Sequence, residues 1–456
     1  MRFREFNFDG LVGPTHNYAG LSHGNVASTA NAGQAANPRR AALQGLGKMR
    51  FVASLGAGQA VLPPHERPSL RTLRRLGCRG SDENVLAGAA SDPDLRDQLL
   101  RLSSSAAAMW TANAATCVPS CDSEDGRLHL VPANLTAMFH RALEARTTAR
   151  VLRAIFADGA RFVVHDPLPG GAHFADEGAA NHTRLFATSP QPGVAGDAVH
   201  LLAWGRRAFG GGGQGEPRKF PARQTREASQ AIARLGQVRP GRALFPQQDP
   251  EGIDAGAFHT DVLAVGNGNL LLLHEKAFVD HEALLQKLRA LLGPGFIAVV
   301  ASEGELPVAD AVASYPFNSQ LLSLPDGTMA IVAPEEAREN PRARGFLERV
   351  LASGGPVKRV HHLALGDSMQ NGGGPACLRQ RILLSDDERA AVGARVFWDE
   401  ALGLALEAWV SKHYRDRVHA DDLRDPLLAR ETMTSLDELT RILRLGPVYD
   451  FQSSSG

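Results

Sequence analysis

Two kinds of hydrophobic pattern alternate along this chain from one end to the other. Apolar residues recur at helical spacing in four separate segments, residues 38–55, 140–156, 225–235 and 400–414, and these predict helices. Short apolar runs between such segments predict strands instead. The predicted strands are residues 60–62, 128–131, 161–165, 200–204, 296–300, 329–332 and 379–385.

Turn and cap signals add detail to this pattern. Residues 261–274 read as a hairpin with its turn at 266–269, and Asp326-Gly327 marks a second hairpin turn. The segment 435–438, Ser-Leu-Asp-Glu, has the spacing of a capping box and predicts a helix that begins there and ends at Gly446. Many short strands, several in hairpins and interspersed with helices, indicate repeated mixed β/α units rather than a doubly wound parallel sheet.

Composition limits the classes of function. The 456 residues include 49 basic and 49 acidic side chains, so nothing in the charge favours nucleic acid or an anionic membrane as a partner. No apolar run approaches the roughly 20 residues that span a bilayer, and the N-terminus lacks the apolar core of a secretory signal. Four cysteines in so long a chain fit a reducing cytoplasm. We therefore expect a cytoplasmic protein without membrane segments.

No shift in composition divides the chain, although its length alone would suggest two or three domains. The glycine-rich stretch 210–215 is the best linker candidate, but the alternation of elements resumes on both sides, which favours a surface loop. It lacks the Lys-Ser or Lys-Thr of a phosphate-binding loop. Cys117 and Cys121 flank Pro119 and have no matching second pair, so we expect structural cysteines rather than zinc ligands.

The strongest chemical signal is the segment 371–379, Asn-Gly-Gly-Gly-Pro-Ala-Cys-Leu-Arg. Three glycines and a proline cannot lie inside a helix or an ordinary strand, so they predict a tight loop that backbone or ligand can approach closely. The loop delivers Cys377 directly before a predicted strand. A thiol in that position is a candidate nucleophile, and the alternative is a buried structural cysteine beside a turn.

A cysteine nucleophile needs a proton acceptor nearby, because a free thiol is mostly protonated at neutral pH. His259 and Asp261 lie two residues apart at the predicted start of the hairpin, where they would share one strand face. Glu177 lies in the run Asp-Glu-Gly-Ala-Ala-Asn-His and could act as a general acid or base or hold a cation. The alternative for His259 is a histidine satisfied by local hydrogen bonds, and the alternative for Glu177 is a position in an ordinary polar loop.

Other polar segments suit a ligand pocket, although each alone is a weak signal. The N-terminal segment 7–28 is polar, glycine-rich and carries aromatic residues. An arginine in a pocket would bind a carboxylate-bearing substrate through a bidentate contact. The remaining candidates are Asn113, the pair His140 and Arg141, and Arg223.

Taken together, these segments resemble the N-succinylarginine dihydrolase family. The matching stretches run in order through nearly the whole chain: FNFDGLVGPTHNYAGLS at the start, PPHERP at 63–68, ANAAT at 112–116, DEGAANH at 176–182, PARQTREAS at 221–229, FHTDV at 258–262, FNSQLLS at 317–323 and NGGGPACLR at 371–379. The stretch 210–216 looks longer than is usual in the family, which leaves the local loop geometry near Arg223 open.

The resemblance implies a single α/β domain over residues 1–456, a pentein propeller of five ββαβ modules around a pseudo-fivefold axis. It also implies a homodimer with no cofactor and no metal, acting on the small molecule N2-succinyl-L-arginine. Cys377 looks like the nucleophile, with Glu177 and His259 as its catalytic partners. The implied substrate contacts are Ala19, Gly20, Ser22, Asn25, Ser28, Asn113, His140, Arg141, Arg223, Asp261 and Asn371.

The resemblance further implies two rounds of hydrolysis that release two ammonia and one carbon dioxide and leave N2-succinyl-L-ornithine. The nearest alternative is a single-step deiminase or amidinotransferase of the same fold. A metal-dependent ureohydrolase would need an Asp-rich dimetal motif, and a papain-like hydrolase its own signature around the cysteine; neither is present. A non-catalytic arginine-binding protein would not need Cys377, Glu177 and His259 together.

Overall fold

Five three-stranded sheets of the same topology form the frame of the molecule. A computed structural model describes residues 2–92, 95–187, 197–210 and 215–453. In every sheet the middle strand pairs antiparallel with one neighbour and parallel with the other. The strand orders are β15-β1-β2, β3-β4-β5, β6-β7-β8, β9-β10-β11 and β12-β13-β14. The strands are β1 (Phe3–Gly10), β2 (Gly58–Leu62), β3 (Ala115–Val118), β4 (Leu128–Pro132), β5 (Phe162–Val164), β6 (His182–Leu185), β7 (Val199–Leu202), β8 (Ala243–Leu244), β9 (Ala264–Asn267), β10 (Leu270–His274), β11 (Ile297–Ala301), β12 (Gln320–Ser323), β13 (Met329–Pro334), β14 (Val357–Leu363) and β15 (Arg379–Ser385).

One or two helices connect the middle strand of each sheet to its parallel neighbour, because a parallel pair needs a crossover. Each sheet is therefore a ββαβ unit, and the first unit combines the C-terminal strand β15 with the N-terminal strand β1. The helices are α1 (Val26–Ala30), α2 (Pro38–Ser54), α3 (Leu70–Arg75), α4 (Asp82–Ser91), α5 (Arg96–Ser103), α6 (Phe139–Ala142), α7 (Ala145–Ile155), α8 (Arg226–Leu235), α9 (Pro250–Ala255), α10 (His281–Leu292), α11 (Val308–Ser314), α12 (Glu335–Glu339), α13 (Pro341–Ala352), α14 (Gly366–Asn371), α15 (Asp386–Ala391), α16 (Glu400–His413) and α17 (Pro426–Leu443).

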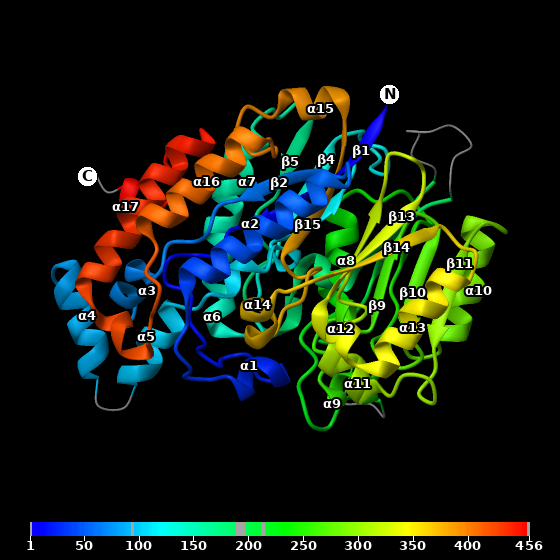
Figure 1. Cartoon of the computed structure of the whole chain (residues 1–456), viewed down its shortest axis with the longest axis horizontal. Helices are drawn as coiled ribbons and strands as arrows, with labels where there is room; N and C mark the ends of the chain where they lie inside the picture. Colours follow the sequence, from blue (N-terminus) through cyan, green and yellow to red (C-terminus); the bar gives the residue numbers. More distant parts are fainter. Residues whose placement is uncertain (1, 93–94, 188–196, 211–214, 454–456) are drawn as a thin grey trace.

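The first strands of neighbouring sheets lie against one another, since β6 contacts β9, β9 contacts β12 and β15 contacts β3. One large hydrophobic core runs through all five units. A second, smaller core joins α3, α4 and α5 to the C-terminal segment, where Leu73 and Leu86 pack with Val418 and Leu428. Figure 1 shows these N-terminal helices beside α17 at the left of the molecule.

The predicted mixed β/α units and both hairpins are confirmed. β9 and β10 pair around a turn at Gly268-Asn269, and β12 and β13 pair around the turn that contains Asp326-Gly327. The glycine-rich candidate loop falls partly outside the described residues, at 211–214.

Two helix predictions are wrong. The segment 140–156 is not one helix, because it breaks between α6 and α7 at Leu143-Glu144. The capping box at 435–438 does not begin a helix either. α17 begins at Pro426, where the Asp425 side chain accepts a hydrogen bond from the backbone N–H of Leu427, and Ser435 is buried in its middle. The Ser435 hydroxyl donates to the carbonyl of Thr432 instead of capping.

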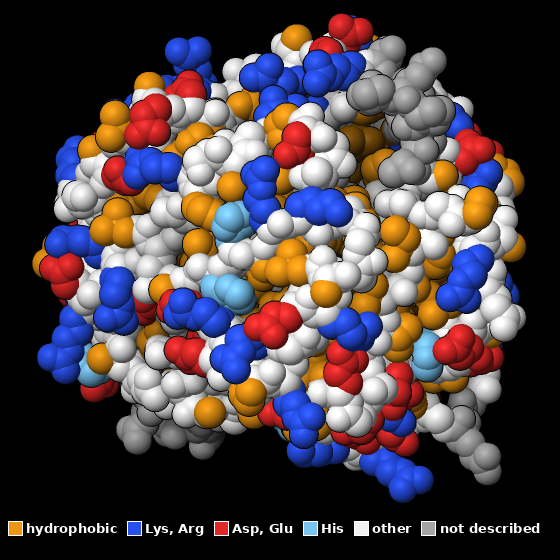
Figure 2. Space-filling model, turned by 45° about the vertical axis from the view of Figure 1, so that its right-hand side comes forward, with side chains coloured by type: hydrophobic (Ala, Val, Ile, Leu, Met, Phe, Trp, Pro, Cys, Tyr) orange, Lys and Arg blue, Asp and Glu red, His pale blue; other side chains and the backbone are white. Residues whose placement is uncertain are grey.

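Basic and acidic side chains are interspersed on the face shown in Figure 2, as expected from the balanced composition. None of the helices in the described ranges combines the length and hydropathy that a bilayer crossing requires.

Candidate active site

The glycine loop lies between α14 and β15 and is packed on three sides. Gly372 has a φ of +97°, a left-handed conformation that disfavours side chains. A Cβ at Gly372 would collide with the amide of Asn25, one at Gly373 with the ring of Trp110, and one at Gly374 would lie 2.7 Å from Asn318 Oδ1. The three glycines are therefore required by close packing, and the loop is held by its surroundings rather than free to flex.

Asn318 clamps the cysteine that follows this loop. Its side-chain amide donates to Cys377 Sγ at 3.2 Å, and its Oδ1 accepts from the Cys377 backbone N–H at 3.3 Å. The thiol also contacts Asp261 Oδ2 at 3.6 Å. Burial raises the pKa of Cys377 well above its ordinary value, and the carboxylate of Asp261 adds to the effect. The resting sulfur is therefore a protonated thiol that donates toward Asp261.

Glu177 and His259 form a second buried pair. His259 Nε2 lies 2.6 Å from Glu177 Oε2, and both side chains are at most 1% exposed. Burial lowers the pKa of His259 to about 4, opposed in part by Glu177. Burial alone would raise the pKa of Glu177, but the hydrogen bond from His259 and the nearby arginines hold it below its ordinary value. At neutral pH the pair is a neutral imidazole donating to a carboxylate.

The segment around Asn113 joins the two pairs. The backbone N–H of Ala112 donates to the carbonyl of Cys377 at 3.1 Å, and the Asn113 amide donates to the carbonyl of Glu177 at 2.7 Å. Gly178, with φ +70°, lies so close that a Cβ there would be 3.0 Å from the Asn113 backbone. Cys377 and the Glu177–His259 pair therefore belong to one buried cluster.

The expected common strand face of His259 and Asp261 is wrong. His259 is extended, but residues 260–262 form a 3₁₀ turn, η5 (Thr260–Val262), and β9 begins only at Ala264. Asn181 holds this turn by accepting from the backbone N–H of Thr260 at 2.8 Å. Because of this turn, the His259 side chain contacts Glu177 and the Asp261 side chain contacts Cys377.

Two arginines from different elements approach Glu177. Arg141, at the end of α6, donates to both carboxylate oxygens of Glu144, at 2.8 and 3.2 Å. Its Nη1 reaches Asn113 Oδ1 at 3.4 Å. Arg223, in the loop before α8, has its Nη1 3.9 Å from Glu177 Oε2. The Arg223 guanidinium lies over the ring of Phe258, 4.7 Å from its centroid.

The N-terminal loop covers this cluster. Asn25 caps α1 by accepting from the backbone N–H of Ser28, and its amide donates to the carbonyl of Gly372 at 2.8 Å. Ser22 accepts from Arg223 at 3.1 Å. Asn371 donates to the carbonyl of Asn17 at 3.1 Å, which ties the start of the glycine loop to the same segment.

The other three predicted contacts are placed as follows. His140 is buried, and burial together with the charges of Arg141 and Arg223 lowers its pKa to about 3. Ala19 and Gly20 belong to the covering loop, but the carbonyl of Ala19 accepts from Arg101, and Gly20 packs on Ala32.

Sequence reasoning missed two amides in the site. Asn318 holds Cys377, as described above. Gln224 accepts from the backbone N–H of Glu177 at 2.6 Å and donates to Asp176 at 3.2 Å. Both lie within stretches that carry the family resemblance, but an asparagine or glutamine in an unremarkable segment has no local signature of its own.

Solved structures similar to this chain are distant in sequence. The N-terminal domain of an arginine dihydrolase from cyanobacteria, solved with product, covers 84% of this chain and 97% of its own at 14% identity and a TM-score of 0.49. A dimethylarginine dimethylaminohydrolase adduct covers 84% of this chain and all of its own at 11% identity and a TM-score of 0.43. Neither likeness is close enough to assign a fold or an activity here.

Curated relatives are much closer. A protein of Myxococcus xanthus named N-succinylarginine dihydrolase is 65% identical over 98% of this chain and 100% of its own length. A protein of the same name from Chromohalobacter salexigens is 54% identical over 98% of both chains. Residues 2–452 match the family described as succinylarginine dihydrolase. The chain described here belongs to the succinylarginine dihydrolase family.

Proposed function

We propose that this protein hydrolyses N2-succinyl-L-arginine with two waters to N2-succinyl-L-ornithine, two ammonia and carbon dioxide, in the breakdown of arginine. The observation that carries the proposal is the joining of a buried thiol, Cys377, to a buried carboxylate–imidazole pair, Glu177 and His259, in a chain of this family. A thiol nucleophile beside a carboxylate that can hold a cation suits attack on a guanidinium carbon.

In the first cycle the planar cation of the substrate lies against the carboxylates of Glu177 and Asp261. Its charge favours the thiolate, and the thiol proton, which is directed toward Asp261 at rest, passes to His259 as Cys377 forms a bond to the guanidinium carbon. His259 then donates that proton to the departing nitrogen, which leaves as ammonia. Nδ1 of His259 has no hydrogen-bond partner among the described residues, so a lone pair is available for this transfer.

The adduct left on Cys377 is an amidino thioether. His259 removes a proton from water, the water oxygen attacks the same carbon, and the carbon–sulfur bond breaks to give a ureido product. A second attack by Cys377 on the ureido carbon expels the second ammonia and leaves a thiocarbamate. Its hydrolysis gives a carbamate, which loses carbon dioxide and leaves the ornithine amine.

The carboxylates of the substrate need a cationic partner, and Arg223 is suited to this role. Its Nη2 is bound to Ser22 and to the carbonyl of His23, whereas its Nε and Nη1 have no hydrogen-bond partner in the described part of the chain. The unpaired N–H groups on Nε and Nη1 can each donate to a carboxylate of the substrate. Asn25, Asn371 and the rest of the covering loop then close over the bound molecule.

The stoichiometry of the products tests this function. Full-length protein incubated with N2-succinyl-L-arginine should release two ammonia for each N2-succinyl-L-ornithine formed, measured by a coupled ammonia assay and mass spectrometry. The Cys377→Ser variant should lose at least about 10³-fold in kcat, because a hydroxyl is a far weaker nucleophile than a thiolate. Normal turnover by this variant would overturn the covalent scheme.

A different stoichiometry would favour the second candidate. One ammonia and a ureido product would indicate a single-step deiminase, and transfer of the amidino group to an amine would indicate an amidinotransferase. Both would retain the thiol chemistry and lose the second cycle.

The same proposal extends to architecture and setting. We infer a single domain in which the five ββαβ units close into a pentein propeller around the site, and the pairing of β15 with β1 supports such closure. We further propose a cytoplasmic homodimer, which analytical ultracentrifugation and cell fractionation would test.

A further inference from the structure

A large cavity borders the catalytic cluster, and neither Arg223 nor the covering loop is part of its lining. Its volume is about 710 Å³, and it reaches between the strands β1, β6, β9 and β15. Small side chains next to Asn113, Glu177 and Cys377 form its inner wall: Ala112, Ala179, Ala180 and Ala376. Of the acidic side chains in the catalytic cluster, Asp261 is the one that lines it. We call this space the rear cavity.

The rear cavity is rich in arginine. The charged residues that line it are Arg2, Arg4, Arg184, Arg379 and Arg381 against Glu5, Asp261 and Asp386. Arg184 is already paired with Asp122, a residue outside the lining. Arg381 donates to the carbonyls of Gly266 and Leu321, both at 2.9 Å, and lies 3.3 Å from Glu5. These two arginines therefore have internal partners.

Arg379 does not. Its guanidinium makes no hydrogen bond and no ion pair with any residue in the described ranges, and its Nε is buried without a partner. Burial and the charge of Arg381 lower its pKa to about 9. A guanidinium carries five N–H donors, so this arrangement leaves all five to groups outside the protein. The Arg379 side chain is only partly buried, so its unpaired N–H groups can be reached by an anion that enters the cavity.

The nearest carboxylates are engaged elsewhere. Asp9 is paired with Lys48 and accepts from Gln59 at 2.8 Å. Glu5 accepts from Asn267 at 3.0 Å and pairs with Arg381. Asp261 accepts from the thiol of Cys377. The undescribed segment 188–196, which follows Phe186 of the cavity lining, contains no Asp or Glu in its sequence.

We propose that the rear cavity is a binding site for a small inorganic oxyanion of the bicarbonate type, held by the guanidinium of Arg379. The planar fork of a guanidinium matches two oxygens of such an anion, and the volume leaves room for it together with its water. Arg223 and the covering loop are not part of the lining, and Asp261 is the residue that the cavity shares with the proposed substrate site. The choice of bicarbonate rests on the proposed function, in which carbon dioxide forms at Cys377, next to Ala376 of the cavity lining.

Binding can be measured without substrate. ¹³C-labelled bicarbonate is titrated into the full-length protein at pH 8 and constant ionic strength, with sodium chloride as the balancing salt, and followed by ¹³C NMR line broadening and by the melting temperature. The wild type should show saturable broadening and a rise in melting temperature. Arg379→Met should bind at least tenfold more weakly and show no rise. Arg239→Gln, at an exposed arginine outside the cavity, should behave as the wild type.

Arg379→Lys provides a second variant that keeps the charge but loses the fork, and it should bind with intermediate affinity. Equal binding by wild type and both Arg379 variants, or no saturable binding by wild type up to about 100 mM, would overturn the proposal. Neither result depends on turnover, so a failure of the anion site is distinguishable from a failure of the proposed reaction.

Discussion

Arg141 and Arg223 are both buried beside Glu177, but the protein holds them in opposite ways. Arg141 has an internal counter-ion, because Glu144 three residues later accepts two of its hydrogen bonds. Burial alone would lower the pKa of Arg141, and Glu144 reverses that effect. Among the described residues, the one acidic group paired with Arg223 is Glu177, at 3.9 Å, and burial keeps the pKa of Arg223 lowered.

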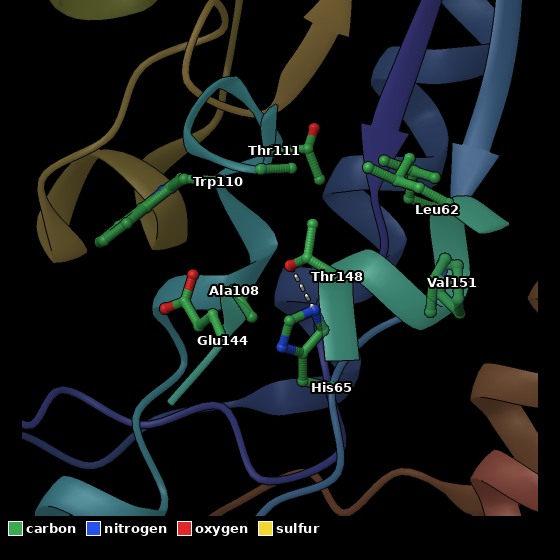
Figure 3. Close-up of a pocket in the computed structure, with 11 residues that line it drawn as sticks. Leu62, His65, Ala108, Trp110, Thr111, Glu144, Thr148 and Val151 are labelled. Atoms are coloured by element: carbon green, nitrogen blue, oxygen red, sulfur yellow. Dashed lines mark hydrogen bonds between the residues drawn. The ribbon is translucent and has the colours of Figure 1, made fainter. Parts of the chain in front are cut away.

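The surroundings of Glu144 strengthen this contrast. Its carboxyl lies under the loop of Trp110 and borders a small cavity of about 20 Å³, enough for one water (Figure 3). On the same cavity His65 Nε2 and Thr148 Oγ1 form a hydrogen bond at 3.4 Å. The Arg141 guanidinium thus has internal hydrogen-bond partners, whereas Arg223 keeps N–H donors that no described residue uses. We infer that Arg141 positions Asn113 and Glu177, and that Arg223 binds a carboxylate of the substrate.

The largest effect should come from removing the carboxylate that pairs with Arg141. Glu144→Gln leaves the buried Arg141 guanidinium without its hydrogen-bonded carboxylate, which should lower the free energy of unfolding by about 3–5 kcal/mol. Urea unfolding monitored by circular dichroism would measure it. The matched control is Glu335→Gln, which removes another pair at a spacing of three residues, with Arg338, but at the surface. That control should cost at most about 1 kcal/mol.

A double variant sharpens this test. Replacing both members, Arg141→Met with Glu144→Leu, removes the unpaired charge along with the pair and should recover much of the lost stability. If Glu144→Gln were no more harmful than Glu335→Gln, the pair would not be the internal counter-ion described above.

Substitution of Arg223 should have the opposite pattern, with little change in stability and a loss of activity. Arg223→Met should leave the unfolding free energy unchanged or slightly higher, because a poorly compensated charge is removed. It should lower kcat/KM for N2-succinyl-L-arginine by about 10²- to 10³-fold, mainly through KM, since a desolvated charge contact contributes about 2–5 kcal/mol. Steady-state kinetics and urea unfolding on the same preparation measure both.

Arg226 supplies the control, because it lies three residues further on and its guanidinium packs over Trp204, away from Glu177. Arg226→Met should leave KM nearly unchanged. A loss of stability in Arg223→Met comparable with that of Glu144→Gln would contradict the distinction between the two arginines.

Sequence patterns predicted those parts of the fold that depend on local periodicity. The strands and hairpins follow from short apolar runs and turn residues, and Cys377 follows from the glycines before it. The break between α6 and α7 does not, because the buried pair of Arg141 and Glu144 depends on packing with distant segments. The start of α17 was missed although Asp425-Pro426 is a cap signal, because the Ser435 motif competed with it.

The clamp on Cys377 was beyond local reasoning for a physical reason. Asn318 is 59 residues from the thiol it holds, and nothing near it in sequence marks that contact. The same is true of Gln224, which is 47 residues from the Glu177 backbone it fixes. Long-range hydrogen bonds between amides depend on how the five units pack, and a motif shows only its own neighbours.

The smallest effect concerns the acid limb of stability, where both arginines act on His140. Its folded pKa is about 3, lowered by burial and then by Arg141 and Arg223, against an ordinary value of about 6.5. At a pH between these two pKa values His140 is protonated in the unfolded chain and neutral in the folded chain. The free energy of unfolding therefore falls as pH decreases from about 6.5. His140→Asn should flatten this decline, by at most about 1.4 kcal/mol per pH unit, in urea titrations at pH 4.5, 5.5 and 6.5. Arg223→Met should flatten it less, because Arg141 and burial still act on the imidazole. An unchanged slope in His140→Asn would show that other histidines, His259 among them, dominate the acid limb.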